Sequence, residues 1–157
     1  MILNIHQRLR VDLERMNMAV YVAIFVALKV ALWYGVEYFY FGFTNESIAR
    51  EPVEIGNIYF TFIAITIFGP ALETYLIQYL FFKHLSGRLS HWWIVILSAV
   101  VFALFHTYNL GYVLYAFLSG LILSISYLLR LRSNPFVSTL LIHSLYNLLG
   151  FIYNHWG

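Results

Sequence analysis

Four polar residues with acid–base or hydrogen-bonding chemistry lie inside otherwise apolar stretches of the sequence. They are Glu73, His106, His143 and Asn147. A buried carboxylate can act as a general base toward water, a histidine can orient that water or protonate a leaving group, and an amide can stabilise an oxyanion. Those are the parts needed for amide hydrolysis. Glu73 and the two histidines could instead ligate a zinc ion, whose bound water would be the nucleophile.

The spacing of these residues favours positions on helices. His143 and Asn147 are four residues apart, so on a helix they share one face and lie about 6 Å from each other. Glu73 follows Gly69-Pro70, a pair that is expected to kink a helix or to split it into two pieces. The structural alternative is that these groups only form hydrogen bonds between helices, as polar residues in membrane bundles often do.

Several other chemistries are excluded by what the sequence lacks. There is no cysteine, so disulfides, thiolate metal sites and cysteine nucleophiles are ruled out. Asp12 is the only aspartate, which excludes a two-aspartate protease, and neither an HExxH nor a GxSxG motif is present. A haem or quinone site built on His106 and His143 is a further interpretation, but it leaves Glu73 and Asn147 without a role.

The composition indicates that the elements positioning these residues are membrane helices. The chain is 62% hydrophobic and 10% charged, with a mean hydropathy of +0.77, whereas soluble domains are about 45–50% apolar and about 25% charged. The excess apolar surface must face a lipid bilayer, and nothing suggests a nucleic-acid partner. We therefore predict a single all-α domain over 1–157, a polytopic membrane helix bundle of about five transmembrane helices, the first an uncleaved anchor. The predicted helices cover about 18–40, 58–82, 92–108, 112–129 and 136–153.

The basic residues predict how the bundle is oriented. If five helices alternate, seven basic residues fall on one side, and Arg50 with three glutamates falls on the other. The seven are Arg8, Arg10, Arg15, Lys83, Arg88, Arg130 and Arg132. The positive-inside rule then places the N-terminus in the cytoplasm and the C-terminus outside. Lys29 lies within the first helix, where we expect a structural role, through snorkelling or through pairing with a carboxylate in the bundle.

Three short patterns, in this order, resemble the signatures of the CPBP family, which contains the CAAX prenyl endopeptidases and the bacteriocin-processing or immunity proteins also called the Abi family. The resemblance covers about Phe68 to Leu149, roughly half of the chain. The patterns are Glu73-Thr74 with Gln78 after a Gly-Pro pair, Phe102 with His106, and His143 with Asn147. In the family the first pattern is Glu-Glu followed by three residues and Arg, so Thr74 and Gln78 are departures from it.

The resemblance implies an intramembrane endopeptidase of the bacterial inner membrane that acts on a membrane-associated peptide or protein. By the resemblance, Glu73 would activate water, while His106, His143 and Asn147 would bind that water and the oxyanion. Thr74, Gln78 and Phe102 would support them, with Thr74 and Gln78 forming a neutral pair in place of the family's Glu and Arg. We expect no cofactor, with zinc on Glu73, His106 and His143 as the alternative.

A second function remains open because of these departures. If the family's second glutamate is needed for chemistry, the protein is a non-catalytic scaffold or immunity-type member that acts as a subunit of a larger membrane complex. The chain is also short for the family, so partner subunits are expected to supply any further substrate-gripping element. In either case each polar group must face protein or water, because a polar group left in lipid is costly. We therefore predict that Glu73, His106, His143 and Asn147 meet in one inward-facing cluster.

Overall fold

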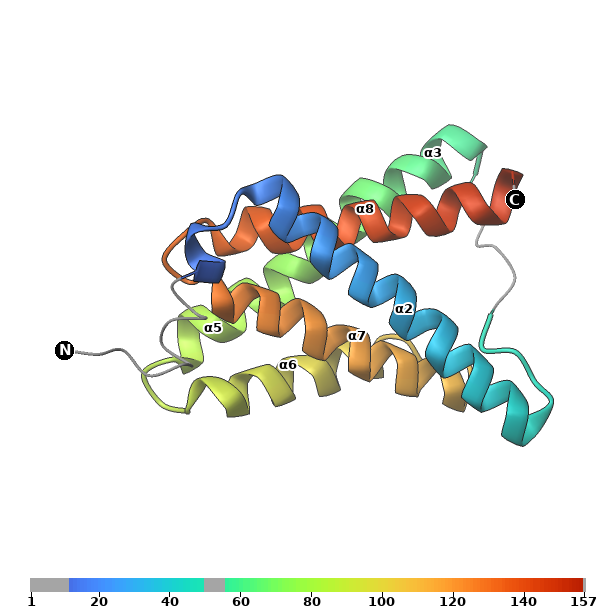
Figure 1. Cartoon of the computed structure of the whole chain (residues 1–157), viewed down its shortest axis with the longest axis horizontal. Coiled ribbons are helices and arrows are strands. Elements are labelled where there is room, and N and C mark those ends of the chain that lie inside the picture. Colours follow the sequence, from blue (N-terminus) through green and yellow to red (C-terminus); the bar gives the residue numbers. More distant parts are fainter. Residues whose placement is uncertain (1–11, 50–55, 157) are drawn as a thin grey trace.

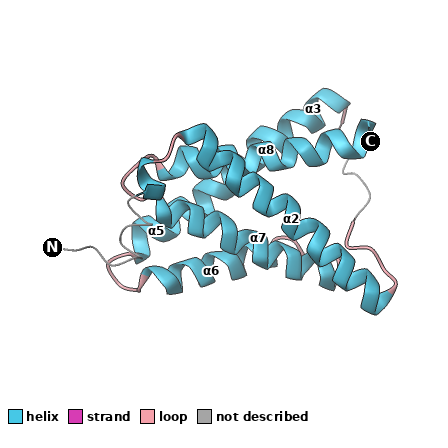
Figure 2. Cartoon of the chain, in the orientation of Figure 1, coloured by secondary structure: helices cyan, strands magenta, loops and turns pink. Residues whose placement is uncertain are grey.

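The described part of the chain consists mainly of apolar helices that alternate in direction (Figure 1). The computed structural model describes residues 12–49 and 56–156, and within them every regular element is a helix (Figure 2). Helix α2 covers Met18–Thr44, α6 covers His91–Leu104, α7 covers Leu110–Leu129 and α8 covers Pro135–Trp156. Between α2 and α6, one continuous helical segment contains α3 (Ile58–Ile63), α4 (Gly69–Glu73) and α5 (Leu80–Leu85), separated by π-helical turns at Ala64–Phe68 and Thr74–Tyr79.

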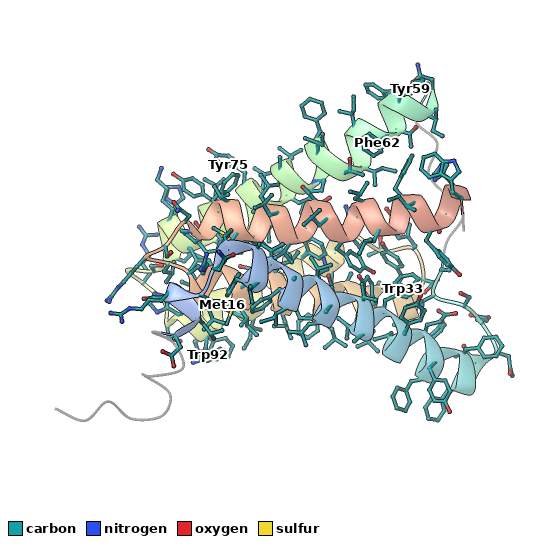
Figure 3. The ribbon with its side chains drawn as sticks, turned by 45° about the horizontal axis from the view of Figure 1, so that its top comes forward. Met16, Trp33, Tyr59, Phe62, Tyr75 and Trp92 are labelled. Carbon is teal, nitrogen blue, oxygen red and sulfur yellow. The ribbon has the colours of Figure 1, made fainter. Side chains whose placement is uncertain are left out.

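The predicted all-α membrane bundle is confirmed. Four helical segments in the described part of the chain are long and apolar enough to cross a membrane: α2, Ile58–Leu85, α7 and α8. Their outer faces carry large apolar side chains, and Figure 3 shows Tyr59 and Tyr75 pointing away from the neighbouring helices. Helix α7 is the most enclosed of the four, with half of its most apolar stretch buried. The protein is therefore a multi-pass membrane protein whose interior is organised around α7.

The third helix is shorter than the sequence suggests. We predicted a helix over 92–108, but α6 ends at Leu104 and has 14 residues, which at 1.5 Å per residue reaches only about 21 Å of a hydrocarbon core about 30 Å thick. The following turn is set by Asn109, whose backbone is extended and whose side chain accepts the N–H of Tyr112 to begin α7. His106 consequently lies in the connection after α6. The other helices extend beyond their predicted ends by a few residues.

The Gly69-Pro70 pair changes the winding of its helix without splitting it. Pro70 has no N–H, and its ring crowds the carbonyl of the residue four positions earlier. The chain accommodates this with a π-helical turn in which the N–H of Gly69 donates to the carbonyl of Ala64, five residues back. A second π-helical turn follows directly after Glu73. Glu73 therefore lies between two widened turns of a continuous helix.

Helices α6 and α7 approach each other closely at Gly120. A Cβ atom at Gly120 would lie 3.0 Å from the Cα of Ala99 and 3.1 Å from the Cβ of Phe102. Small residues allow membrane helices to pack at such short separations. This contact fixes the end of α6 from which Phe102 and His106 reach the interior.

We expect Gly120→Ala to destabilise the protein by about 1–3 kcal/mol, because the added methyl group meets backbone that cannot move aside. Gly150→Ala in α8 is the matched control, since nothing lies within 4 Å of its added Cβ and alanine is the better helix former by about 1 kcal/mol. Thermal unfolding in detergent should give a lower Tm for the first variant and an equal or higher Tm for the second. An unchanged Tm for Gly120→Ala would contradict the close approach.

Candidate active site

Glu73 and His143 face each other across the bundle. Glu73 is the last residue of α4, and His143 lies in the N-terminal half of α8. The Glu73 Oε2 and His143 Nε2 atoms are 3.5 Å apart, with the histidine side chain 4% exposed and the glutamate side chain 32% exposed. The carboxylate thus contacts a buried imidazole and is also accessible from outside the packed interior. This is the arrangement a general base needs if water is to reach it.

His106 joins this pair through Phe102. The His106 ring stacks on the Phe102 ring at a centroid distance of 4.4 Å, and the Phe102 ring lies 5.7 Å from that of His143. The His106 Nδ1 atom is 2.7 Å from the carbonyl oxygen of Phe102. Because a carbonyl only accepts, Nδ1 carries the hydrogen, and Nε2 is then the basic nitrogen of the neutral ring. The Phe102 ring therefore contacts both imidazoles, and the Phe102 carbonyl fixes the orientation of the His106 ring.

Asn147 donates a hydrogen bond to a backbone carbonyl that has no donor within the π-helical turn before Pro70. The Nδ2 atom of Asn147 donates to the carbonyl oxygen of Ile65 at 3.0 Å. In an α-helix this carbonyl would accept from Gly69, but the N–H of Gly69 donates to Ala64 instead. The next possible donor, Pro70, has no N–H. Asn147 therefore ties α8 to the widened turn just before Glu73, a structural contact that sequence patterns did not reveal.

We expect Asn147→Leu to lower stability by about 1–3 kcal/mol, because it leaves the partly buried Ile65 carbonyl without a donor. In a Pro70→Ala background the loss should be smaller, since the restored N–H at position 70 can serve that carbonyl. Thermal unfolding of the two single variants and the double variant measures this difference. Asn154→Leu, at an exposed position on the same helix, is the control. An equal loss in both backgrounds would contradict the assignment.

Thr74 and Gln78 are completely buried in the π-helical turn after Glu73. Among the described residues, the Thr74 hydroxyl and both polar atoms of the Gln78 amide lack a hydrogen-bond partner. The two side chains thus do not form the neutral pair expected from their four-residue spacing, because π-helical winding changes which residues face each other. Buried polar groups of this kind are normally satisfied, often by water.

Lys29 is a feature of the site whose partner the sequence did not identify. Its side chain is 1% exposed in the middle of α2, and its Nζ atom lies 4.4 Å from the centre of the Tyr146 ring. Tyr146 is on α8 between His143 and Asn147. His143, three residues before Tyr146 on the same helix, is the residue that contacts Glu73. The sequence signal for this residue was a lysine at the centre of an apolar helix. The sequence did not identify the partner of Lys29, because the partner depends on how α2 packs against α8.

The donor set does not match a zinc site. Within the described residues, no three His, Asp or Glu side chains are close enough together to hold one metal ion. Glu73 and His143 are neighbours, whereas His106 lies beyond Phe102 with its Nδ1 directed to a carbonyl. The contacts that the structure shows are those of a partly exposed carboxylate with one buried imidazole, and of that imidazole with the Phe102 ring on which His106 stacks.

Comparison with known proteins identifies one family. The family model described as "Type II CAAX prenyl endopeptidase Rce1-like" matches residues 55–149, well over half of the chain. The match begins shortly before α3 and ends within α8, so it contains Glu73, His106, His143 and Asn147 and leaves α2 outside. No curated protein and no solved structure matches the chain.

Proposed function

We propose, from the premise that the chain belongs to the type II CAAX prenyl endopeptidase Rce1-like family, that it hydrolyses a peptide bond of a membrane-associated substrate with Glu73 as the general base. The observation that carries this proposal is the contact between Glu73 and the buried His143 at 3.5 Å, with the carboxylate still partly exposed. A protease needs a base that is not sealed inside packed protein, and the Glu73 carboxylate meets this requirement.

The proposed steps use only groups of this chain. Glu73 takes a proton from a water molecule as its oxygen attacks the scissile carbonyl carbon, and the carbonyl oxygen becomes an oxyanion. The basic Nε2 of His106 holds the water by accepting one of its hydrogens. Asn147 uses one amide hydrogen on Ile65, and its second is available to the oxyanion. The proton gathered at the Glu73–His143 pair then passes to the leaving nitrogen as the C–N bond breaks.

The test is cleavage of a fluorogenic peptide by the purified protein in liposomes. A prenylated CAAX peptide and the same peptide without the prenyl group should both be tried, with and without a metal chelator. We expect cleavage by the native protein, none by Glu73→Gln, and no effect of the chelator, because the donor set does not match a metal site. Cleavage that survives Glu73→Gln would reject Glu73 as the base, and loss of cleavage on chelation would reject the metal-independent mechanism.

A non-catalytic scaffold or immunity-type subunit is the second candidate. One observation favours it: Asn147 is engaged with backbone, as expected of a residue whose function is packing. In that case Glu73→Gln and the native protein would behave alike in the peptide assay, and a partner membrane protein would be recovered with both. Cleavage by the native protein alone separates the two candidates.

We also propose that the N-terminus is cytoplasmic and that the membrane is the bacterial inner membrane. Arg130 donates to the backbone carbonyls of Met16 and Glu14, which places the end of α7 beside the start of α2. The described basic residues outside Lys29 belong to this end of the bundle: Arg15, Lys83, Arg88, Arg130 and Arg132. Arg8, Arg10, Arg50, Glu51 and Glu54, on which the charge asymmetry also depends, lie outside the described residues.

We expect reporter fusions in the turn between α7 and α8 and after the end of α8 to fall on opposite sides of the membrane, with the turn in the cytoplasm. A fusion in the turn between α5 and α6 is the control and should report the same side as the first. If the fusion after α8 reported the cytoplasm, the proposed orientation would be wrong.

A further inference from the structure

We propose that Lys29 of α2 is a positioning residue of the site, whose buried ammonium stabilises negative charge on Glu73 and so holds the carboxylate ready to accept a proton. This inference rests on the proposed function, because it assigns Lys29 a part in the same reaction. It also adds a helix to the site, since α2 lies outside the segment that matches the family model.

Lys29 is buried near the middle of α2, far from both ends of the helix. Lys29 is eleven residues from Met18 and fifteen from Thr44, the two ends of the helix. Its side chain therefore cannot snorkel to either membrane surface, as lysines near helix ends do. The side chain instead turns inward and is 1% exposed. An ammonium held inside a membrane bundle is costly unless a group of opposite charge lies nearby.

Tyr146 supplies only part of this compensation. The Lys29 Nζ atom lies 4.4 Å from the centre of the Tyr146 ring, a cation–π geometry that fixes where the ammonium sits. A neutral ring cannot balance a full positive charge. Tyr146 does, however, hold the ammonium against the part of α8 that carries His143 and Asn147. The position of the charge is therefore set by the helix that forms the site.

Glu73 is the group that balances the charge. Helix α2 and the other described spans contain one further acid, Glu37, and its carboxylate accepts the N–H of Ile48 at 2.9 Å beyond the end of α2. The ring of Tyr146, which holds the Lys29 Nζ atom, follows His143 by three residues on α8. His143 in turn lies 3.5 Å from Glu73, the remaining acid in the described spans. Three helices thus bring Lys29, His143 and Glu73 into one region of the bundle. A cation in this region favours the ionised form of the Glu73 carboxylate, which is the form that a general base requires.

A double-mutant cycle on stability tests the pairing without depending on catalysis. The variants are Lys29→Met, Glu73→Gln and the double variant, compared by thermal unfolding in detergent. Each single variant leaves one charge inside the bundle without its partner, so each should lower the Tm, and the double variant should recover most of the loss. Lys83→Met is the matched control, because Lys83 also lies over a tyrosine ring, that of Tyr79 at 5.3 Å, but is exposed. Additive losses in the cycle would overturn the pairing.

The second readout is peptide cleavage in liposomes. Lys29→Met should lower kcat on the order of 10²-fold, the loss typical of removing one electrostatic group from an active site, while KM changes little. Lys29→Arg keeps the charge and should recover part of kcat, and Lys83→Met should match the native protein. Native kcat in Lys29→Met would overturn the role in catalysis. If the native protein cleaves no peptide, the proposed function fails, whereas the stability cycle still decides whether Lys29 and Glu73 are paired.

Discussion

Glu73→Gln should abolish peptide cleavage to within the background of the assay, a loss of about 10³-fold or more. The substitution preserves the size of the side chain and its place between the two π-helical turns, but an amide cannot accept a proton from water. General-base catalysis by a positioned side chain typically contributes about 10²–10⁴-fold. The neighbouring His143 cannot fully replace the lost base, because its side chain is only 4% exposed and its Nε2 atom faces the changed side chain at position 73.

The measurement is the initial rate of cleavage by protein reconstituted at equal density for each variant. Glu37→Gln is the matched control, since Glu37 is also a carboxylate on a membrane helix, and a glutamine there can still accept the N–H of Ile48. Its rate should equal that of the native protein. A Glu73→Gln rate within threefold of the native rate would show that another group is the base, and the scaffold interpretation would then gain weight.

The sequence predicted the helices well because lipid imposes a simple rule on the chain. A spanning segment must be long and apolar, and four of the predicted helices have those properties in the structure. The exception was the third helix, which was predicted to reach residue 108 but stops at Leu104. Its end depends on Asn109 capping the next helix, a local hydrogen bond that hydropathy does not record.

Sequence patterns singled out the polar residues of the proposed site but did not indicate which groups each of them contacts. Glu73 and His143 are neighbours, as expected of polar groups that avoid lipid. Asn147 was expected to serve the oxyanion, and its bond to Ile65 depends on a π-helical turn that no spacing rule describes. Lys29 was noticed for its charge, yet its place beside Tyr146 follows from the packing of α2 against α8. Contacts between distant segments are set by helix packing, which composition and periodicity do not specify.

Replacing the histidines should separate their roles. His143→Ala should reduce kcat by about 10²–10⁴-fold, the contribution typical of an acid–base group, because it removes the ring in contact with Glu73. His106→Ala should also reduce kcat, since the ring that orients water is lost, but Glu73 and His143 would remain in contact. Initial rates over a range of peptide concentrations give kcat and KM for each variant.

The chain contains a close structural match for His106 away from the site. His155 stacks on Phe151 with a centroid distance of 4.1 Å, and its Nδ1 atom lies 2.9 Å from the Phe151 carbonyl oxygen. His106 makes the same two contacts with Phe102, but Phe102 also touches His143. His155→Ala therefore removes the same local packing without touching the proposed site, and it should leave kcat unchanged. Equal losses in His106→Ala and His155→Ala would mean that His106 only packs, and the water would then be held by Glu73 and His143 alone.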